Sequence, residues 1–500
     1  MHHQLKTKES RAIPNVPAAL LTAPSSGQGK SMITAALARL HKNAGRRVRV
    51  FKHGPDYLDP MVLGVASGAP VYQLHPWMIG SDECRYRVAA AAQDADVILV
   101  EGAMGLYDGS PSSADLASLL GLPVALVIDA RAMAETFGAI VSGIADYRDD
   151  IDLYGVIANR VGSQGHAAML RKSMPQSQAW LGAVPRSDTL TIADRHLGLV
   201  QAAELNDLDE RLDAAATVLE EAGLGELPPA VHFAEPDPLS PPPALLSGKR
   251  IAVARDRAFA FIYRANIELL EAMGAELAYF SPLEDSQVPE ADAIWLPGGY
   301  PELYAAELAA NSSMLQSLRD HHGCMRGTRR GTGTAGQGQG CKGTGTAGQG
   351  QGLRADLRGT GCKGTGTAGC KGTGTPDGTS RKGTGTPILA ECGGLMYCAT
   401  ELADKSGARH AMLGLLPGRA EMAERLVGLG LQYWQAEEEQ LRGHTFHHSR
   451  FNTEEQPVAY TSRRSGGAAE PIFQMGSLTA TYFHGYFPSA PKLVASFFSA

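Results

Sequence analysis

The chain has 500 residues, of which 44% are hydrophobic and 19% are charged, and its formal net charge is −7. This length exceeds a single hydrophobic core and predicts at least two domains. The acidic balance argues against general binding to nucleic acid, and no apolar run is long enough to span a membrane. The polar N-terminus lacks a signal-peptide pattern, and the seven cysteines form no C-x-x-C pair. These features predict a protein of the reducing cytoplasm.

After a start, 1–16, that is expected to be disordered, residues 17–225 alternate short apolar runs with helical stretches. This alternation predicts a parallel α/β sheet. The expected strands are 18–23, 47–52, 97–101, 124–129 and 153–159. Residues 226–248 have the proline-rich composition of a linker, and a second α/β pattern occupies 249–500. Its expected elements are apolar runs at 251–254, 276–280, 293–299 and 388–390 and a helix at 265–273.

A low-complexity insert, 327–386, interrupts the second pattern. It repeats G-T-G-T five times and has no aromatic or β-branched apolar residue, so it cannot build a core. A phosphate-binding loop is disfavoured because no strand and helix flank any copy. We expect a disordered surface loop that enters at the N-terminal end of the strand before Cys392, whereas chemistry in such sheets lies at the C-terminal ends. Its deletion should leave turnover unchanged.

A candidate phosphate-binding loop, A-P-S-S-G-Q-G-K-S (23–31), follows the first expected strand. It ends in Gly-Lys-Ser at a strand-to-helix junction, although Pro24 replaces the first glycine of the usual pattern. In such a loop the backbone N–H groups surround the phosphates, Lys30 reaches the terminal ones and Ser31 binds Mg²⁺. The predicted ATP-binding residues of the loop are Ser26, Gly27, Gly29, Lys30 and Ser31. The alternative is an ordinary glycine-rich turn.

Acidic and amide side chains follow other expected strands of the same domain. K-H-G-P-D-Y-L-D-P (52–60) places Asp56 and Asp59 after one strand, and Glu101 ends the next. Carboxylate oxygens suit Mg²⁺ bound with phosphates. The predicted magnesium ligands are Ser31, Asp56 and Glu101, and Asp59 is assigned to the phosphate or substrate region. Asn159, at the end of another strand, is predicted to read the adenine base, with a simple turn former as the alternative.

Cys392 stands in P-I-L-A-E-C-G-G-L-M-Y (387–397), between a short apolar run and a helical pattern. A strand, a sharp turn of small residues and a helix form the elbow that presents a nucleophile in a strained, exposed position. The helix N-terminus is expected to increase the acidity of the thiol. The alternative is a buried structural cysteine.

The nucleophile needs a base, and His484 in T-A-T-Y-F-H-G-Y-F-P (479–488) is preferred because a strand-like run precedes it. Three other histidines compete for this role: His444, His447 and His448. Their clustering alone is weak evidence for a metal site, since no carboxylate or cysteine lies at ligand spacing. The turn P-G-G-Y-P-E (297–302) follows another strand, and N–H groups at Gly298 and Gly299 are predicted to form an oxyanion hole. An ordinary glycine turn is the alternative there.

Together these motifs resemble the cobyrinate and hydrogenobyrinate a,c-diamide synthases of cobalamin biosynthesis. The resemblance rests on A-P-S-S-G-Q-G-K-S, K-H-G-P-D-Y-L-D-P, E-G-A-M-G-L-Y-D-G, L-P-G-G-Y-P-E, A-E-C-G-G-L-M-Y and H-G-Y-F-P-S. It covers about 17–326 and 387–500. It implies an α/β fold with an N-terminal dethiobiotin-synthetase-like P-loop domain and a C-terminal class I glutamine amidotransferase domain. Cobyric acid synthases share this architecture and are the nearest alternative.

The resemblance also implies a mechanism. Cys392 attacks the amide of glutamine, assisted by His484, and ammonia is released. ATP, with Mg²⁺, phosphorylates the a- and c-acetate carboxylates of a corrinoid, and ammonia then displaces the phosphate. ATP and glutamine are thus co-substrates, and an internal path for ammonia is expected between the sites.

Some features depart from the family or stay open. His484 is followed by Gly485 and Tyr486 instead of Pro-Glu, which implies a Cys–His dyad. The insert is not part of the family pattern, and His53 has no assigned role. A regulatory P-loop ATPase without amidation is a second candidate function, and an inactive product of a repeat-disrupted gene is a third interpretation. The corrin-binding residues, the presence of cobalt in the substrate and the oligomeric state, a homodimer among the options, stay open.

Overall fold

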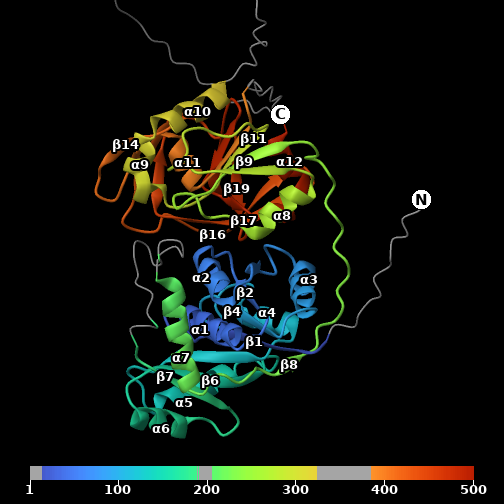
Figure 1. Cartoon of the computed structure of the whole chain (residues 1–500), viewed down its shortest axis with the longest axis vertical. Helices are drawn as coiled ribbons and strands as arrows, with labels where there is room; N and C mark the ends of the chain where they lie inside the picture. The colour runs from blue at the N-terminus through green and yellow to red at the C-terminus, as the bar shows by residue number, and fades with distance from the viewer. Residues whose placement is uncertain (1–13, 188–189, 191–204, 206, 324–384, 500) are drawn as a thin grey trace, which may run out of the picture.

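The computed structural model describes residues 14–187, 190, 205, 207–323 and 385–499. Figure 1 shows two α/β units, joined by the chain between β8 (Ala230–Val231) and β9 (Arg250–Ala254). The predicted disorder of the N-terminus and of the repeat lies almost wholly outside the described residues, although Val16 already begins β1. Within the described part of the chain, no helix is both long and apolar enough to cross a membrane.

The N-terminal unit is a parallel sheet with helices on both faces (Figure 1). Its strand order is β3-β2-β4-β1-β5-β6-β7, and β8 pairs antiparallel with the start of β1. The strands are β1 Val16–Thr22, β2 Val48–His53, β3 Tyr72–Leu74, β4 Val97–Glu101, β5 Val124–Asp129, β6 Leu153–Val161 and β7 Trp180–Pro185. The helices are α1 Lys30–Asn43, α2 Leu58–Ser67, α3 Ser81–Ala92, α4 Ser113–Leu120, α5 Thr136–Ala145, α6 Gln164–Ser173 and α7 Leu208–Glu221. Because both faces are covered, central strands such as β4 are continuous apolar runs.

The C-terminal unit has a mixed sheet in the order β10-β9-β11-β12-β21-β20-β19-β16-β17-β22 and a smaller sheet, β14-β13-β15-β18. The strands of the parallel part are β9, β10 Glu276–Phe280, β11 Ala293–Leu296, β12 Ile388–Glu391 and β21 Leu478–Thr481. The other strands are β13 Ala399–Ala403, β14 Arg409–Ala411, β15 Leu416–Met422, β16 Gly428–Ala436, β17 Glu439–His447, β18 Ser449–Asn452, β19 Ala459–Arg463, β20 Ala468–Met475 and β22 His484–Gly485. The helices are α8 Arg264–Ala272, α9 Ala305–Ala310, α10 Ser312–Gly323, α11 Gly393–Cys398 and α12 Pro491–Phe498.

The mixed α/β architecture confirms the predicted fold class. The strands predicted at 97–101, 124–129 and 276–280 coincide with β4, β5 and β10. The other predicted strands and the predicted helix differ from the observed elements by one to three residues at an end. Such differences are expected, because hydrophobic runs set where a strand lies but not where its last ladder hydrogen bond forms.

The described residues on either side of the insert lie close together. The N–H of Thr386 donates to the carbonyl of His321, near the end of α10, at 2.9 Å. The chain then enters β12 at Ile388 and reaches Cys392 only at the opposite end of this strand. The attachment points of the insert are therefore separated from Cys392 by the length of β12.

The two units contact each other directly. The hydroxyl of Tyr486 donates to Oε1 of Glu83 at 2.6 Å, and that of Tyr72 donates to Oε1 of Glu268 at 2.5 Å. Buried apolar residues from both units also belong to one continuous hydrophobic cluster. In Figure 1 the loops around β2, α2 and α3 accordingly face α8, β16 and β17. This contact brings the C-terminal end of β2 close to the C-terminal unit.

Candidate active site

The predicted phosphate-binding loop connects β1 to the N-terminus of α1, where unpaired backbone N–H groups favour anions. Gly27 and Gly29 have φ values of 81° and 91°, which residues with a Cβ rarely adopt. A Cβ at Gly29 would also lie 2.4 Å from Nδ2 of Asn159. Close packing against Asn159, as well as the turn conformation itself, therefore shapes this loop. It contains the predicted residues Ser26, Gly27, Gly29, Lys30 and Ser31.

Asn159 supports this loop from β6. Its Nδ2 donates to the carbonyl of Gln28 at 2.9 Å, and its Oδ1 accepts from the N–H of Arg160. A cavity of about 270 Å³ opens beside it. Its lining includes Gly29, Ile33, Arg131, Asn159 and Pro185. The predicted adenine reader therefore both braces the loop and faces a cavity next to it.

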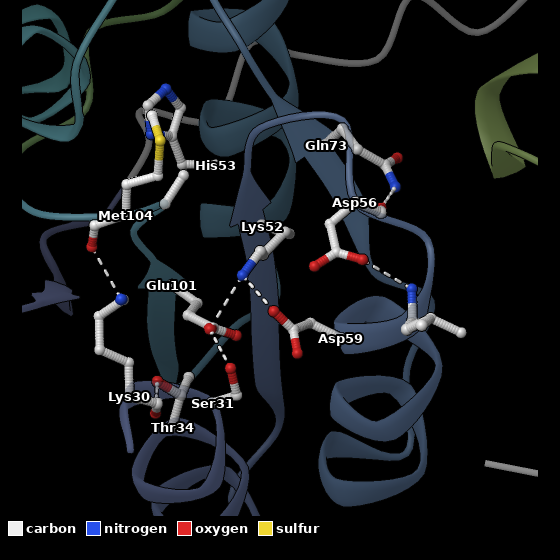
Figure 2. Close-up of polar contacts among 12 residues, drawn as sticks. Lys30, Ser31, Thr34, Lys52, His53, Asp56, Asp59, Gln73, Glu101 and Met104 are labelled. Atoms are coloured by element: carbon white, nitrogen blue, oxygen red, sulfur yellow. Dashed lines mark hydrogen bonds and ion pairs between the residues drawn. The ribbon is translucent and has the colours of Figure 1, made fainter. Parts of the chain in front are cut away.

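Lys52 lies at the centre of a buried polar cluster, shown in Figure 2. Its Nζ donates to Oε1 of Glu101 at 2.9 Å and also bonds to Asp59, while the hydroxyl of Ser31 donates to the same Glu101 oxygen at 2.6 Å. Burial by itself disfavours the ammonium, but Asp59 and Glu101 hold the pKa of Lys52 above its ordinary value. Lys52 was not predicted as a site residue, although β2 and β4 pair Lys52 with Glu101.

Asp56 lies at the edge of this cluster. Its Oδ1 accepts the N–H of Leu58 at 2.8 Å, and Figure 2 shows it on the far side of Asp59 from Glu101. Burial raises the pKa of Asp56 to about 7, and the charge of Asp59 acts in the same direction. The structure thus brings Ser31, Glu101 and Asp59 together around Lys52, with Asp56 next to Asp59.

The side chains of this cluster fit a magnesium ion that is bound mainly by phosphates. Oε2 of Glu101 is buried and has no hydrogen-bond partner in the described structure. The oxygens of Ser31 and Asp59 lie beside it, and hard oxygens are the ligands that Mg²⁺ prefers. No group of three His, Cys, Asp or Glu side chains in the described ranges is arranged as a complete metal site. Mg²⁺ usually takes one or two protein carboxylates and completes its shell with phosphate and water.

His53, whose role the sequence left open, ends β2 and lies near Met104 in Figure 2. Its Nδ1 is 3.0 Å from the hydroxyl of Ser113, and its ring stacks on His75 with centroids 5.5 Å apart. Burial lowers the pKa of His53 to about 3, so the ring is neutral at physiological pH. Next to it, Lys30 donates to the carbonyl of Met104 at 2.8 Å (Figure 2).

In the C-terminal unit, Cys392 occupies the predicted elbow between β12 and α11. Its φ of 46° and ψ of −98° lie outside the regions that residues with a Cβ favour. The glycines that follow allow a close approach: a Cβ at Gly394 would lie 2.1 Å from the carbonyl oxygen of Leu296. The strained strand-turn-helix geometry agrees with the sequence prediction.

The expected exposure of the thiol is wrong, and the acidity expected from the helix N-terminus is outweighed, although the backbone N–H of Gly393 acts in that direction. Cys392 is only 4% exposed, and burial raises its pKa, with Glu302 and Glu470 acting in the same direction. Helix α11 has only six residues, so its N-terminus does not overcome the desolvation of a thiolate. Before substrate binds, the group is therefore a neutral thiol.

The predicted base and oxyanion turn meet this elbow. A Cβ at Gly298 would lie 2.2 Å from Cε1 of His484, and a Cβ at Gly393 would lie 2.9 Å from the backbone nitrogen of Gly299. Cys392 and His484 follow the C-terminal ends of β12 and β21, which pair in parallel. The tertiary structure therefore gathers at one sheet edge the three parts that the sequence had assigned to this chemistry.

His484 is held in its neutral form. Burial, followed by the neighbouring His444, lowers its pKa well below the ordinary value. Its Nδ1 is buried and has no hydrogen-bond partner in the described part of the chain. No described carboxylate thus orients the ring through Nδ1, in keeping with a Cys–His dyad.

Glu391, directly before the nucleophile, organises the segment that carries His484. Its Oε1 accepts the N–H of Gly485 at 2.9 Å, and its Oε2 accepts the indole N–H of Trp295 at 2.8 Å. Burial raises the pKa of this carboxyl to about 7. The sequence drew attention to Glu391 only as part of the Cys392 motif, since its bond to Gly485 spans 94 positions of the chain.

Two of the three competing histidines are occupied by other contacts, whereas Nδ1 of His448 is buried without a hydrogen-bond partner in the described structure. Nδ1 of His447 is 2.8 Å from the carbonyl oxygen of Ser449, and its Nε2 is 3.2 Å from Oε1 of Glu470. Nδ1 of His444 is 3.0 Å from the hydroxyl of Tyr263. His447 thus has both ring nitrogens engaged, which favours His484 as the base.

This geometry defines a glutamine amidotransferase unit joined to a P-loop nucleotide-binding unit, and comparison with known families gives the same pairing. The model of the CobQ/CobB/MinD/ParA nucleotide binding domain matches residues 20–200. That of the CobB/CobQ-like glutamine amidotransferase domain matches 250–327 and 379–492, interrupted where the insert lies.

The chain belongs to the cobyrinate and hydrogenobyrinate a,c-diamide synthase family. It is 47% identical to a hydrogenobyrinate a,c-diamide synthase of Stutzerimonas stutzeri, covering 96% of this chain and 98% of the relative. It is 43% identical to a cobyrinate a,c-diamide synthase of Herminiimonas arsenicoxydans, covering 96% of both chains. The family resemblance predicted from the motifs is thereby confirmed.

Proposed function

We propose that this protein uses ATP and glutamine, drawn from the cytoplasm, to amidate the a- and c-acetate carboxylates of hydrogenobyrinate or cobyrinate in cobalamin biosynthesis. The observation that carries the proposal is that one chain holds two complementary sites in units that contact each other directly. One site has the strained Cys392 and His484 after the paired strands β12 and β21, and the other has the Lys30 loop beside the Glu101 cluster. A regulatory ATPase without amidation would need no such elbow.

In the glutaminase reaction, Sγ of Cys392 attacks the amide carbon of glutamine. His484 accepts the thiol proton and passes it to the leaving nitrogen, which departs as ammonia. Water then hydrolyses the thioester to glutamate and restores the thiol. N–H groups at Gly298 and Gly299 stabilise the oxyanion in both steps. Because burial keeps thiol and imidazole neutral, the proton moves only as the carbon–sulfur bond forms.

In the synthetase reaction, an oxygen of the corrinoid carboxylate attacks the γ-phosphorus of ATP and releases ADP. The acyl phosphate is required because a free carboxylate is a poor electrophile for an amine. Ammonia then attacks the acyl carbon, phosphate leaves, and one proton is lost to give the amide. Lys30 and the loop N–H groups hold the phosphates in line for this transfer, and a second round amidates the other carboxylate.

Ser31, Glu101 and Asp59 would hold Mg²⁺, with Asp56 next to Asp59. When bound, Mg²⁺ neutralises charge that develops on the β- and γ-phosphate oxygens. The ammonium of Lys52 bonds to both carboxylates and favours their ionised forms, which opposes the rise in the pKa of Glu101 that burial and the charge of Asp59 cause. The cavity beside Asn159 has the position expected for the adenine base.

The direct test incubates the full chain with hydrogenobyrinate or cobyrinate, ATP, Mg²⁺ and glutamine and follows the products by mass spectrometry. We expect two successive carboxylate-to-amide conversions at the a and c positions of at least one substrate. Ammonium salts should replace glutamine in the same assay. Amidation at other side chains would instead indicate a cobyric acid synthase activity, and unmodified substrate would refute the proposal.

A further inference from the structure

Tyr57 belongs to the nucleotide-binding unit, but its ring is buried in the glutamine amidotransferase unit. It lies between Asp56 and Asp59 in the chain and is 8% exposed. Its ring stacks on Tyr263, with centroids 4.4 Å apart, and on Phe261 at 5.1 Å with an interplanar angle of 2°. Both partners come from the other unit.

The ring of Tyr57 also contacts the glutaminase machinery. It lies 5.3 Å from the ring of His484 and 5.6 Å from that of His444, centroid to centroid. The N–H of Phe261 donates to the carbonyl of Gly298 at 3.0 Å, so the receiving aromatic wall is tied to the predicted oxyanion turn. The pocket that receives Tyr57 is thus made of the same segments as the glutaminase site.

The orientation of the His484 ring depends on packing, because its Nδ1 has no hydrogen-bond partner in the described structure. The ring orientation depends on its neighbours: Gly298 on one side, His444 stacked at 5.0 Å, and Tyr57. A displacement of Tyr57 would remove one of these supports. The position of a ring from the nucleotide unit therefore affects where the base can point.

On its other side, Tyr57 is joined to the phosphate cluster by a very short stretch of chain. Two residues later, Asp59 bonds to Lys52, which bonds in turn to Glu101. The carbonyl of Pro55 accepts the hydroxyl of Tyr263 at 2.9 Å, which anchors the start of this stretch across the unit boundary. A ligand that rearranges Asp59 or Asp56 must also act on the backbone that carries Tyr57.

We propose that Tyr57 is a positioning residue that couples the two sites, so that nucleotide and corrinoid at the Asp56–Asp59 loop set the orientation of His484 and thereby the rate of glutamine hydrolysis. The inference rests on the proposed function and names one part of its regulation. Coupling requires a ligand that binds one arrangement of the loop better than another. Asp56 and Asp59 of the loop contact such a ligand. A shift of these residues moves Tyr57, which in turn changes the packing against His484.

The test compares Tyr57→Ala with Tyr57→Phe in the full-length enzyme. Three quantities are measured: glutamate released per amide formed, the stimulation of glutaminase by ATP, Mg²⁺ and corrinoid, and amidation with ammonium salts. Tyr57→Phe keeps the stacked ring and should behave as wild type. Tyr57→Ala should lose about fivefold or more of the stimulation and release excess glutamate per amide, while ammonia-dependent amidation continues.

Tyr72→Ala is the matched control, because it truncates another tyrosine of the nucleotide unit that contacts the other unit, through Glu268. It should keep wild-type stimulation. The proposal is overturned if wild type shows no stimulation, if Tyr57→Ala keeps it, or if Tyr72→Ala loses it equally. Should Tyr57→Ala not fold, Tyr57→Leu, which fills the site without an aromatic face, is judged by the same criteria. Absence of ammonia-dependent amidation in wild type would instead contradict the proposed function.

Discussion

The nucleotide site buries charged side chains, whereas the glutaminase site buries groups that are held neutral. In the first, Lys52 stays protonated because Asp59 and Glu101 lie within bonding distance. In the second, desolvation raises the pKa of Cys392 and lowers that of His484. The ionic cluster of the first site suits the proposed binding of Mg²⁺ and phosphate, while the second site needs its substrate before charge can develop. Mutations that affect one site and spare the other sharpen this contrast.

The largest expected effect is that of Cys392→Ser. The serine hydroxyl is a far weaker nucleophile, so glutamine-dependent amidation should fall by at least about a thousandfold. Amidation with ammonium salts should persist, because the nucleotide site is intact. Parallel assays with the two nitrogen donors check this. Loss of both activities, or of neither, would show that the roles are not divided in this way.

Glu101→Gln should impair the nucleotide site and spare the glutaminase site. It removes a carboxylate beside Ser31 and leaves Lys52 with one acidic partner, so amidation should fall about a hundredfold or more with either nitrogen donor. The Mg²⁺ concentration for half-maximal rate should rise. Basal glutaminase activity, measured as glutamate release without ATP, should survive. Unchanged Mg²⁺ dependence of this variant would contradict the proposed role of Glu101 as a Mg²⁺ ligand.

Glu391→Gln tests whether the buried groups of the glutaminase site are neutral, through the dependence of protein stability on pH. The pKa of this buried carboxyl is raised from its ordinary value to about 7, so the folded protein holds its proton more tightly than the unfolded chain. The resulting stability, on the order of 3 kcal/mol at most, is complete below the unfolded pKa and is lost as pH rises towards 7. Glutamine does not titrate, so the variant should gain stability relative to wild type between pH 5 and 7.

Thermal unfolding of both proteins across this range measures the difference. The variant also places an amide N–H₂ where Glu391 accepts the N–H of Gly485 or of Trp295, which should destabilise it by about 1–3 kcal/mol at low pH. Parallel pH profiles for the two proteins would mean that Glu391 is ionised throughout.

The smallest effect is expected from replacing residues 324–384 by a short glycine-serine linker. The flanking residues already meet at the bond between Thr386 and His321, so little chain is needed to join them. Because the free-energy cost of loop closure depends only logarithmically on loop length, the free energy of unfolding should change little. Glutaminase and amidation activities should both stay within about twofold of those of the full chain. A large loss of glutaminase turnover at unchanged stability would contradict the separation of the insert from Cys392.

The sequence was informative wherever a few neighbouring residues are sufficient to specify the backbone geometry. Glycines at 27 and 29, the Gly-Lys-Ser ending and the Cys-Gly-Gly elbow each specify backbone geometry within a few residues, and the structure contains these turns. Lys52 was missed because its significance depends on pairing between β2 and β4. Asp56 and Asp59 were correctly placed at a strand end, but no local pattern indicates which of them faces Glu101.

By itself, the sequence determined the α/β class and the positions of the strands, and it predicted the nucleophile and the phosphate-binding residues, because these follow from short-range periodicity and turn chemistry. Only the tertiary structure decided the protonation state of Cys392 and His484, the ionic cluster around Lys52 and the contact of Tyr57 with the opposite site. Each of these depends on which distant side chains exclude water or supply charge, and that is set by packing across the sheet and between the two units.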